Sequence, residues 1–234
     1  MSSLDPTLQA KDAKPQAVLS MLSTDLGTRA DIPTRSLEVL RTADLVIFEE
    51  AKLGRQFLKA AGVHRDFHLF SEHHQQETLE AAKDIWRKGG TVSYMSDQGS
   101  ANFADPGYQL VTLARSLKVS LRVVPGPNSV AAALSACPFA VERFTYVGFL
   151  ARDESRRRQE LERFGALNMP LVILDTPYRL GALLSSWEQT LPKRKGLLAI
   201  EIGNPDEEYW YGWPADIRKQ VGERKRHNFV LVLR

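Results

Sequence analysis

The chain has 234 residues, of which 43% are hydrophobic and 25% charged, and its formal net charge is +3. This length suits one large domain or two small ones, and the composition is that of an ordinary globular protein. The single cysteine, Cys137, excludes an internal disulfide and a cysteine metal cluster. The single cysteine also fits a reducing cytosol, so we expect a cytoplasmic protein. No apolar run reaches the roughly 18 residues of a membrane span, so no membrane contact is expected.

The first half of the chain alternates strand-like and helix-like segments. Residues 1–16 are polar and lack the apolar region of a signal peptide, so we expect a disordered tail. Helical apolar spacing fills the gaps between the strand-like runs, and Pro106 is expected to begin the last helix, with Asp105 as its cap. Strands are expected at 17–22, 44–48, 91–95 and 121–124. This alternation predicts a parallel sheet with helices on its faces.

The second half is richer in strands. Strands are expected at 143–149, 170–174, 196–202, 208–212 and 228–233. One strong helix lies among them, marked by Leu180, Leu183, Leu184, Trp187 and Leu191. A mixed sheet follows from this pattern. We therefore predict two α/β domains, residues 17–126 and 127–234, with a cleft between them.

The segment SDQGSANFADPGYQL (96–110) contains a long loop of small, polar and turn-forming residues. Strand-to-helix connections mostly run two to six residues, so an idle surface loop is the weaker interpretation. Parallel α/β sheets bind ligands beyond the carboxyl ends of their strands. Glu49-Glu50 and Pro125-Gly126-Pro127 also follow expected strands, so these loops are predicted to form one binding rim.

The order of several short motifs indicates a family. They are TDLGT (24–28), EEAK (49–52), SEHH (71–74), the 96–108 segment, PGPNS (125–129), GFLAR (148–152), DTPYR (175–179) and FVLV (229–232). In this order the chain resembles the tetrapyrrole-methylase superfamily of S-adenosylmethionine-dependent methyltransferases. Within it, the chain is most similar to the bacterial branch that 2′-O-methylates a cytidine of small-subunit ribosomal RNA.

The resemblance implies S-adenosylmethionine in the interdomain cleft, no metal, a homodimer, and ribosomal RNA or the small ribosomal subunit as partner. The implied candidates for the base or for substrate positioning are Glu49, Glu50, Glu72 and His73, of which Glu50 and His73 are expected to be catalytic. Glycine at position 99 lets the backbone approach a ligand closely, and Asp97 can accept a hydrogen bond from it. The implied donor-binding residues are Leu26, Asp97, Gln98, Gly99, Phe103, Asn128, Ser129, Leu174 and Ile202.

The chain departs from the family pattern at several positions. Asp25 replaces a proline, Ala101-Asn102 replaces a Pro-Gly pair in the donor loop, and Ser71 replaces a histidine. Two alternatives therefore stay open. One is a divergent paralogue that methylates a small molecule, a tetrapyrrole or a peptide; the other is a donor-binding protein without transferase activity.

Three further patterns have two interpretations each. Arg152, Arg156, Arg157 and Arg158 either contact RNA phosphates or form a solvated helix face, and the Arg224-Lys225-Arg226 cluster is a further candidate for RNA contact. EYWYGW (208–213) either stacks on bases or packs into a core or dimer interface. The histidines at 64, 68, 73 and 74 either form a metal site or act separately, and a metal site is the weaker interpretation because their spacing lacks a clear ligand pattern.

Overall fold

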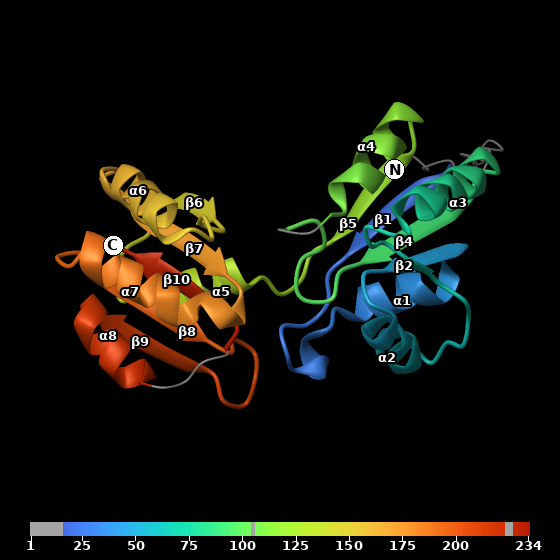
Figure 1. Cartoon of the computed structure of the whole chain (residues 1–234). Helices are drawn as coiled ribbons and strands as arrows, with labels where there is room; N and C mark the ends of the chain where they lie inside the picture. The colour runs from blue at the N-terminus through green and yellow to red at the C-terminus, as the bar shows by residue number, and fades with distance from the viewer. Residues whose placement is uncertain (1–15, 104–105, 223–226) are drawn as a thin grey trace, which may run out of the picture. The chain divides into compact units, whose positions relative to one another are not determined.

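A computed structural model describes residues 16–103, 106–222 and 227–234 (Figure 1). The predicted tail at 1–15, Asp105 and the Arg224-Lys225-Arg226 cluster lie outside these ranges. The chain forms two compact units. The first extends to Thr24 and resumes at 33–125, and the second comprises 25–32 and 126–234. Residues 25–32 are predicted from the sequence to belong to the first domain, whereas their contacts are with the second unit.

The first unit contains a five-stranded sheet in which every neighbouring pair is parallel. This arrangement confirms the predicted parallel sheet. The two-residue strand β3 at one edge was not predicted, because two residues carry no detectable periodicity. In spatial order the strands are β3 (His68–Leu69), β2 (Leu45–Phe48), β4 (Thr91–Met95), β1 (Val18–Leu22) and β5 (Ser120–Val124).

Helices cover both faces of this sheet (Figure 1). One face packs against α3 and α4 around the buried ring of Tyr94. On the other face, the ring of Phe57 in α2 lies 6.0 Å from that of Phe48. Helix α4 begins at Tyr108 after Gly107, and not at Pro106 as predicted. The helices are α1 (Thr34–Thr42), α2 (Ala51–Ala61), α3 (Gln75–Arg87) and α4 (Tyr108–Ser116).

The second unit contains a mixed sheet, as predicted. Strands β6 and β7 are parallel, whereas β10 runs antiparallel to both of its neighbours and β9 is antiparallel to β8. The spatial order is β6 (Thr145–Gly148), β7 (Leu171–Asp175), β10 (Phe229–Leu233), β8 (Gly196–Ile200) and β9 (Glu208–Gly212).

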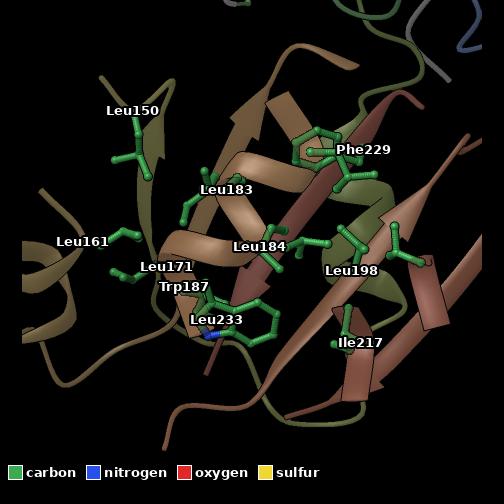
Figure 2. Packing of buried hydrophobic residues seen from close by; sticks show 14 of the residues in the cluster. Leu150, Leu161, Leu171, Leu183, Leu184, Trp187, Leu198, Ile217, Phe229 and Leu233 are labelled. Carbon is green, nitrogen blue, oxygen red and sulfur yellow. The ribbon is translucent and has the colours of Figure 1, made fainter. Parts of the chain in front are cut away.

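Helices α6, α7 and α8 close the main core of the second unit, while α5 packs against β10 on the opposite face (Figure 1). Figure 2 shows the centre of this core, where Trp187 lies among leucine side chains of the strands. Its indole N–H donates to the carbonyl of Arg194 at 3.1 Å. The elements are α5 (Ser129–Ser135), α6 (Glu154–Gly165), the 3₁₀ turn η2 (Pro177–Arg179), α7 (Leu180–Thr190) and α8 (Pro214–Val221).

Only α7 was predicted as a strong helix in this half. Helix α6 buries just Arg157 and Leu161, so its apolar periodicity is too weak to stand out. Helix α5 spans seven residues, fewer than two full turns.

Candidate active site

The long loop after β4 is tied to the end of β1. The backbone N–H of Thr24 donates to the carbonyl of Gly99 at 2.9 Å. The hydroxyl of Ser96, which is fully buried, donates to the carbonyls of Gln98 and Gly99 at 3.4 Å each. Gly99 is buried and has φ +70°, a conformation that favours glycine. Residues 96–99 of the loop are therefore held in a fixed conformation at the carboxyl ends of the central strands.

Asp97 joins this loop to the loop after β2. Its Oδ1 accepts a hydrogen bond from the backbone N–H of Glu50 at 3.2 Å. Burial raises the pKa of Asp97, the Glu50 N–H opposes that rise, and the negative charge of Glu50 adds to it. A carboxylate has more than one acceptor position, so Asp97 can accept a further hydrogen bond from a hydroxyl or amine of a ligand.

Asn102 preserves a backbone conformation that a glycine would supply. Its φ is +66°, in the left-handed region, and it stands where the resembled family has glycine. Asparagine is among the non-glycine residues that enter this region most readily. The replacement of Pro-Gly by Ala101-Asn102 therefore keeps the left-handed turn of the loop.

A second carboxylate at this rim is held by a buried tyrosine. The hydroxyl of Tyr94 donates to Oε1 of Glu49 at 2.5 Å, and the Tyr94 side chain is fully buried. A Cβ added at Gly107 would lie 2.8 Å from Cε1 of Tyr94, so the far end of the loop packs directly over this ring. Glu49 was among the candidates predicted from the sequence, whereas its partner Tyr94 was not. The available signal was a tyrosine near the end of a buried strand, whose hydroxyl requires a partner.

The two residues predicted to be catalytic lie in different settings. Glu50 is the N-cap residue of α2, its side chain is exposed and makes no capping hydrogen bond, and its backbone contacts Asp97. His73 is exposed in the turn between β3 and α3. Among the described residues, no hydrogen bond joins His73 to the 96–107 loop. Of the donor-binding candidates in this unit, Gln98 is exposed and Phe103 is half-buried, with its N–H on the Ser100 carbonyl at 3.2 Å.

Segment 26–28 packs against the turn after β8 in the second unit. The hydroxyl of Thr28 donates to the carbonyl of Gly203 at 2.5 Å. A Cβ added at Gly203, which has φ +81°, would lie 3.1 Å from Cβ of Leu26. The structure thus brings Leu26 next to the turn that follows Ile202.

The other candidates of the second unit lie on β7 and at the start of α5. Leu174 is half-buried in β7, opposite Val230 of β10. Asn128 is the N-cap residue of α5, and its Oδ1 accepts from the N–H groups of Val130 and Ala131 at 3.0 and 3.1 Å. The carboxamide oxygen of Asn128 is therefore engaged, and what it offers a ligand is the amide nitrogen. Ser129, also half-buried, begins the helix.

The GFLAR and DTPYR motifs form one network. Arg179 forms an ion pair with Asp175 at 3.1 Å and donates to the carbonyls of Leu150 and Ala151 at 2.9 and 2.6 Å. Burial raises the pKa of Asp175, while hydrogen bonding by the Thr176 N–H and the nearby arginines lowers it. These two motifs therefore fix the loop after β6.

Arg157 belongs to this network and does not face solvent. Its side chain donates to the hydroxyl of Ser186 at 2.9 Å and to the carbonyl of Arg152 at 2.8 Å, and the residue is 5% exposed. The interpretation of Arg157 as an RNA contact is wrong, because its guanidinium is buried against backbone carbonyls. Arg158 forms an ion pair with Glu154 at 3.0 Å. Arg152 and Arg156 are exposed.

Among the described residues, the remaining histidine, cysteine and acidic side chains do not add a metal site or a reactive thiol to these loops. In the part of the chain that the structure describes, no three His, Cys, Asp or Glu side chains gather as a metal site. Burial raises the pKa of Cys137 to about 11, so it is a protonated thiol at neutral pH. No helix in the described ranges is long and apolar enough to cross a membrane.

Two solved methyltransferase structures share this fold. The uroporphyrin-III-C-methyltransferase of Thermus thermophilus superposes with a TM-score of 0.62 at 20% identity, covering 92% of this chain and 93% of that one. The same kind of enzyme from that organism, complexed with S-adenyl homocysteine, gives 0.63 at 16% identity, covering 93% and 96%.

The sequence model of the Tetrapyrrole (Corrin/Porphyrin) Methylases matches residues 19–212. The chain belongs to this family and is a S-adenosylmethionine-dependent methyltransferase. It is similar to the ribosomal RNA small subunit methyltransferase I of Neisseria meningitidis, with 30% identity over 230 residues, 96% of this chain and 78% of that protein. The protein of the same name from Coprothermobacter proteolyticus is 30% identical over 216 residues, 92% of this chain and 97% of that protein.

Proposed function

We propose that this protein transfers a methyl group to the 2′-oxygen of a cytidine in small-subunit ribosomal RNA, and that it acts in the cytoplasm. The observation that carries the proposal is the similarity to proteins named ribosomal RNA small subunit methyltransferase I, at 30% identity over 96% of this chain. The solved uroporphyrin methyltransferases share only 16–20% identity with the chain, so they support the fold and not a tetrapyrrole acceptor.

The loop after β4 fits S-adenosylmethionine. The buried, left-handed Gly99 has no side chain to block a ligand from the backbone. Beside it, Asp97 provides a half-buried acceptor whose raised pKa reflects removal from water. We propose that these residues bind the donor together with Gln98 and Phe103. Leu26, Asn128, Ser129, Leu174 and Ile202 of the second unit are proposed to complete the site.

The bound donor supplies a methyl group on a cationic sulfonium, which an attacking oxygen displaces in line. The chain has to orient the ribose hydroxyl and accept its proton. Glu49 is suited to this task, because the Tyr94 hydroxyl fixes one of its carboxylate oxygens at 2.5 Å. Glu50 is the adjacent candidate, and its backbone links the acceptor side of the rim to Asp97. His73 is proposed on the resemblance alone, as a substrate-positioning residue.

We further propose that the protein is a homodimer that associates through β5. This edge strand exposes Leu121 and Val123, which are 41% and 60% accessible. An unpaired edge with apolar side chains favours association with another strand. Val123→Asp should convert the dimer to a monomer in sedimentation velocity, and a wild-type monomer would contradict this proposal.

The acceptor is tested with tritium-labelled donor and small ribosomal subunits from a strain that lacks the corresponding gene, followed by mapping of the labelled nucleotide. Label on a cytidine ribose supports the proposal. Label only in another cell fraction, such as small molecules or peptides, replaces it with the small-acceptor alternative. Donor binding without any transfer replaces it with a donor-binding protein.

A further inference from the structure

Exposed aromatic rings lie along β9, the edge strand of the second sheet. Tyr209 and Tyr211 are 38% and 37% exposed, and Trp213, which follows the strand, is 43% exposed. Trp210 alternates to the opposite face and packs against the core. The aromatic segment therefore divides into one core ring and a row of solvent-facing rings.

Cations lie over these rings. Nζ of Lys195 is 4.8 Å from the ring centroid of Trp213 and 5.9 Å from that of Tyr211. The Phe139 ring lies 5.7 Å from Tyr211, and Cζ of Arg234 is 5.6 Å from the Phe139 centroid. We call these five residues (Phe139, Lys195, Tyr211, Trp213 and Arg234) the aromatic surface.

A basic pocket continues this surface. Arg234 also lines an open pocket of about 710 Å³ together with Ala140, Lys193 and Arg194. The guanidinium of Arg194 is engaged with the backbone carbonyls of Gly165, Met169 and Arg234, so it is structural. Lys193 is exposed, and with Arg234 it supplies the positive charge at the mouth of the pocket.

We propose that the aromatic surface binds single-stranded RNA by stacking unpaired bases on its rings, with phosphates drawn to Lys193, Lys195 and Arg234. The proposal rests on RNA being the substrate, and it assigns a binding site apart from the donor loop. Alternate residues of a strand are about 6.8 Å apart, about twice the contact distance between flat rings, so a base fits between Tyr211 and Trp213 once the Lys195 ammonium that lies over both rings turns to a phosphate. Stacking of this kind tolerates any base, because every base has a flat face.

Charge distinguishes RNA from a second copy of the chain as the occupant. A two-fold contact centred on this surface would bring the three cations of one copy close to those of the other, and this concentration of like charge is unfavourable. A polyanion neutralises these groups instead. Oε2 of Glu207 accepts from the Tyr209 hydroxyl at 3.4 Å, whereas Lys195 lies over Tyr211 and Trp213, so the basic end of the row is at these two rings.

The test uses the full chain and a labelled uridine oligonucleotide of about ten nucleotides, titrated by fluorescence anisotropy in about 50 mM salt. Trp213→Ala and Tyr211→Ala should each weaken binding about fivefold or more. Phe144→Ala is the matched control, because Phe144 is 42% exposed and precedes β6 at the opposite edge of the same sheet. Lys195→Ala should lower the log–log salt slope by about 0.7.

Tryptophan fluorescence adds a readout specific to stacking. Trp86 and Trp187 are buried and Trp210 is half-buried, so quenching by the oligonucleotide should come from Trp213. Trp213→Phe should retain most of the affinity and lose most of the quenching.

The inference would be overturned if the wild type did not bind the oligonucleotide, or if both alanine variants bound it with unchanged affinity. It would also be overturned if the alanine variants changed the oligomeric state of the protein and not its affinity for RNA. The labelled-donor assay keeps the two proposals apart. If the wild type methylates ribosomal RNA and Trp213→Ala behaves like the wild type, the aromatic surface is rejected and the proposed reaction stands. If Trp213→Ala loses oligonucleotide binding but the wild type transfers no methyl group to RNA, the proposed reaction is rejected and the aromatic surface stands.

Discussion

The backbone N–H of Glu50 donates a hydrogen bond to Oδ1 of Asp97 at 3.2 Å, and this contact joins the loops that follow β2 and β4. One carboxylate thereby fixes the shape of two loops. Asp97 bears an energetic cost for this position, since burial raises its pKa above the ordinary value of 3.8.

Asp97→Asn should stabilise the fold at neutral pH and weaken donor binding. The asparagine oxygen can still accept the Glu50 N–H, while the charge that folding disfavours is removed. Because the pKa of Asp97 is higher in the folded state than its ordinary value of 3.8, its ionisation does not destabilise the fold below pH 3.8. The loss of stability appears as the pH rises through the pKa of the folded state. The melting temperature of the variant should therefore exceed that of the wild type at pH 7, and the difference should shrink toward pH 3.8.

Asp44→Asn is the matched control, because the pKa of Asp44 is lowered in the folded protein whereas that of Asp97 is raised. The N–H and hydroxyl of Thr91 lie 2.7 and 2.9 Å from Oδ2 of Asp44 and lower its pKa, with a smaller contribution from the charge of Arg65. The ionised Asp44 carboxylate therefore stabilises the fold above pH 3.8, and this stabilisation is lost as the pH falls through the lowered pKa of the folded state. Asp44→Asn should destabilise the protein at pH 7 and leave donor affinity unchanged. If Asp97→Asn were less stable than the wild type at pH 7, the buried Asp97 carboxylate would not destabilise the fold as proposed.

Gly99→Ala should weaken donor binding beyond its effect on stability. Gly99 has φ +70°, so a Cβ there costs about 1 kcal/mol of conformational strain. Gly62→Ala is the control: Gly62 has φ +69° at the end of α2, with nothing within 4 Å of an added Cβ. Both variants should lose similar stability in denaturant titrations, and calorimetry should show weaker donor binding only for Gly99→Ala. Equal donor affinity in the two variants would exclude the backbone at Gly99 from the site.

The sequence predicted the strand composition of the two sheets more completely than the contacts between the loops of the candidate site. Alternation of apolar runs and helical spacing determined the parallel and mixed sheets, because periodicity reflects which faces are buried. The Tyr94–Glu49 pair was not predictable in this way, since it joins the ends of two strands that are 45 residues apart. Segment 25–32 was misplaced for the same reason: its assignment depends on Thr28 reaching Gly203, a contact that leaves no local pattern.

Tyr94→Phe should lower kcat for methyl transfer about tenfold or more, because Glu49 loses the donor that holds its carboxylate. If Tyr94 acts through Glu49, the same change in a Glu49→Gln background should have little further effect. Rates at saturating donor for the two single variants and the double variant provide this comparison. Independent, multiplicative losses would show that Tyr94 does not act by positioning Glu49.

Arg157→Ala and Arg156→Ala should separate stability from RNA affinity, although the two residues are adjacent. Arg157 is 5% exposed, and its removal leaves Ser186 and the carbonyl of Arg152 without their donor. The loss of a buried charged group that satisfies several partners should reduce the free energy of unfolding by about 3 kcal/mol.

Arg156 is exposed on the same helix, and its backbone N–H donates to Oδ1 of Asp153 at 2.9 Å. Within the ranges that the structure describes, its side chain forms no ion pair. Arg156→Ala should leave the unfolding midpoint unchanged. If the side chain contacts a phosphate of the ribosomal RNA, it should lower the log–log salt slope of binding by about 0.7 to 0.9. An unchanged slope would assign Arg156 to the solvated face of α6. An unchanged unfolding midpoint in Arg157→Ala would contradict the network that joins the loops after β6 and β7, because that network depends on its buried guanidinium.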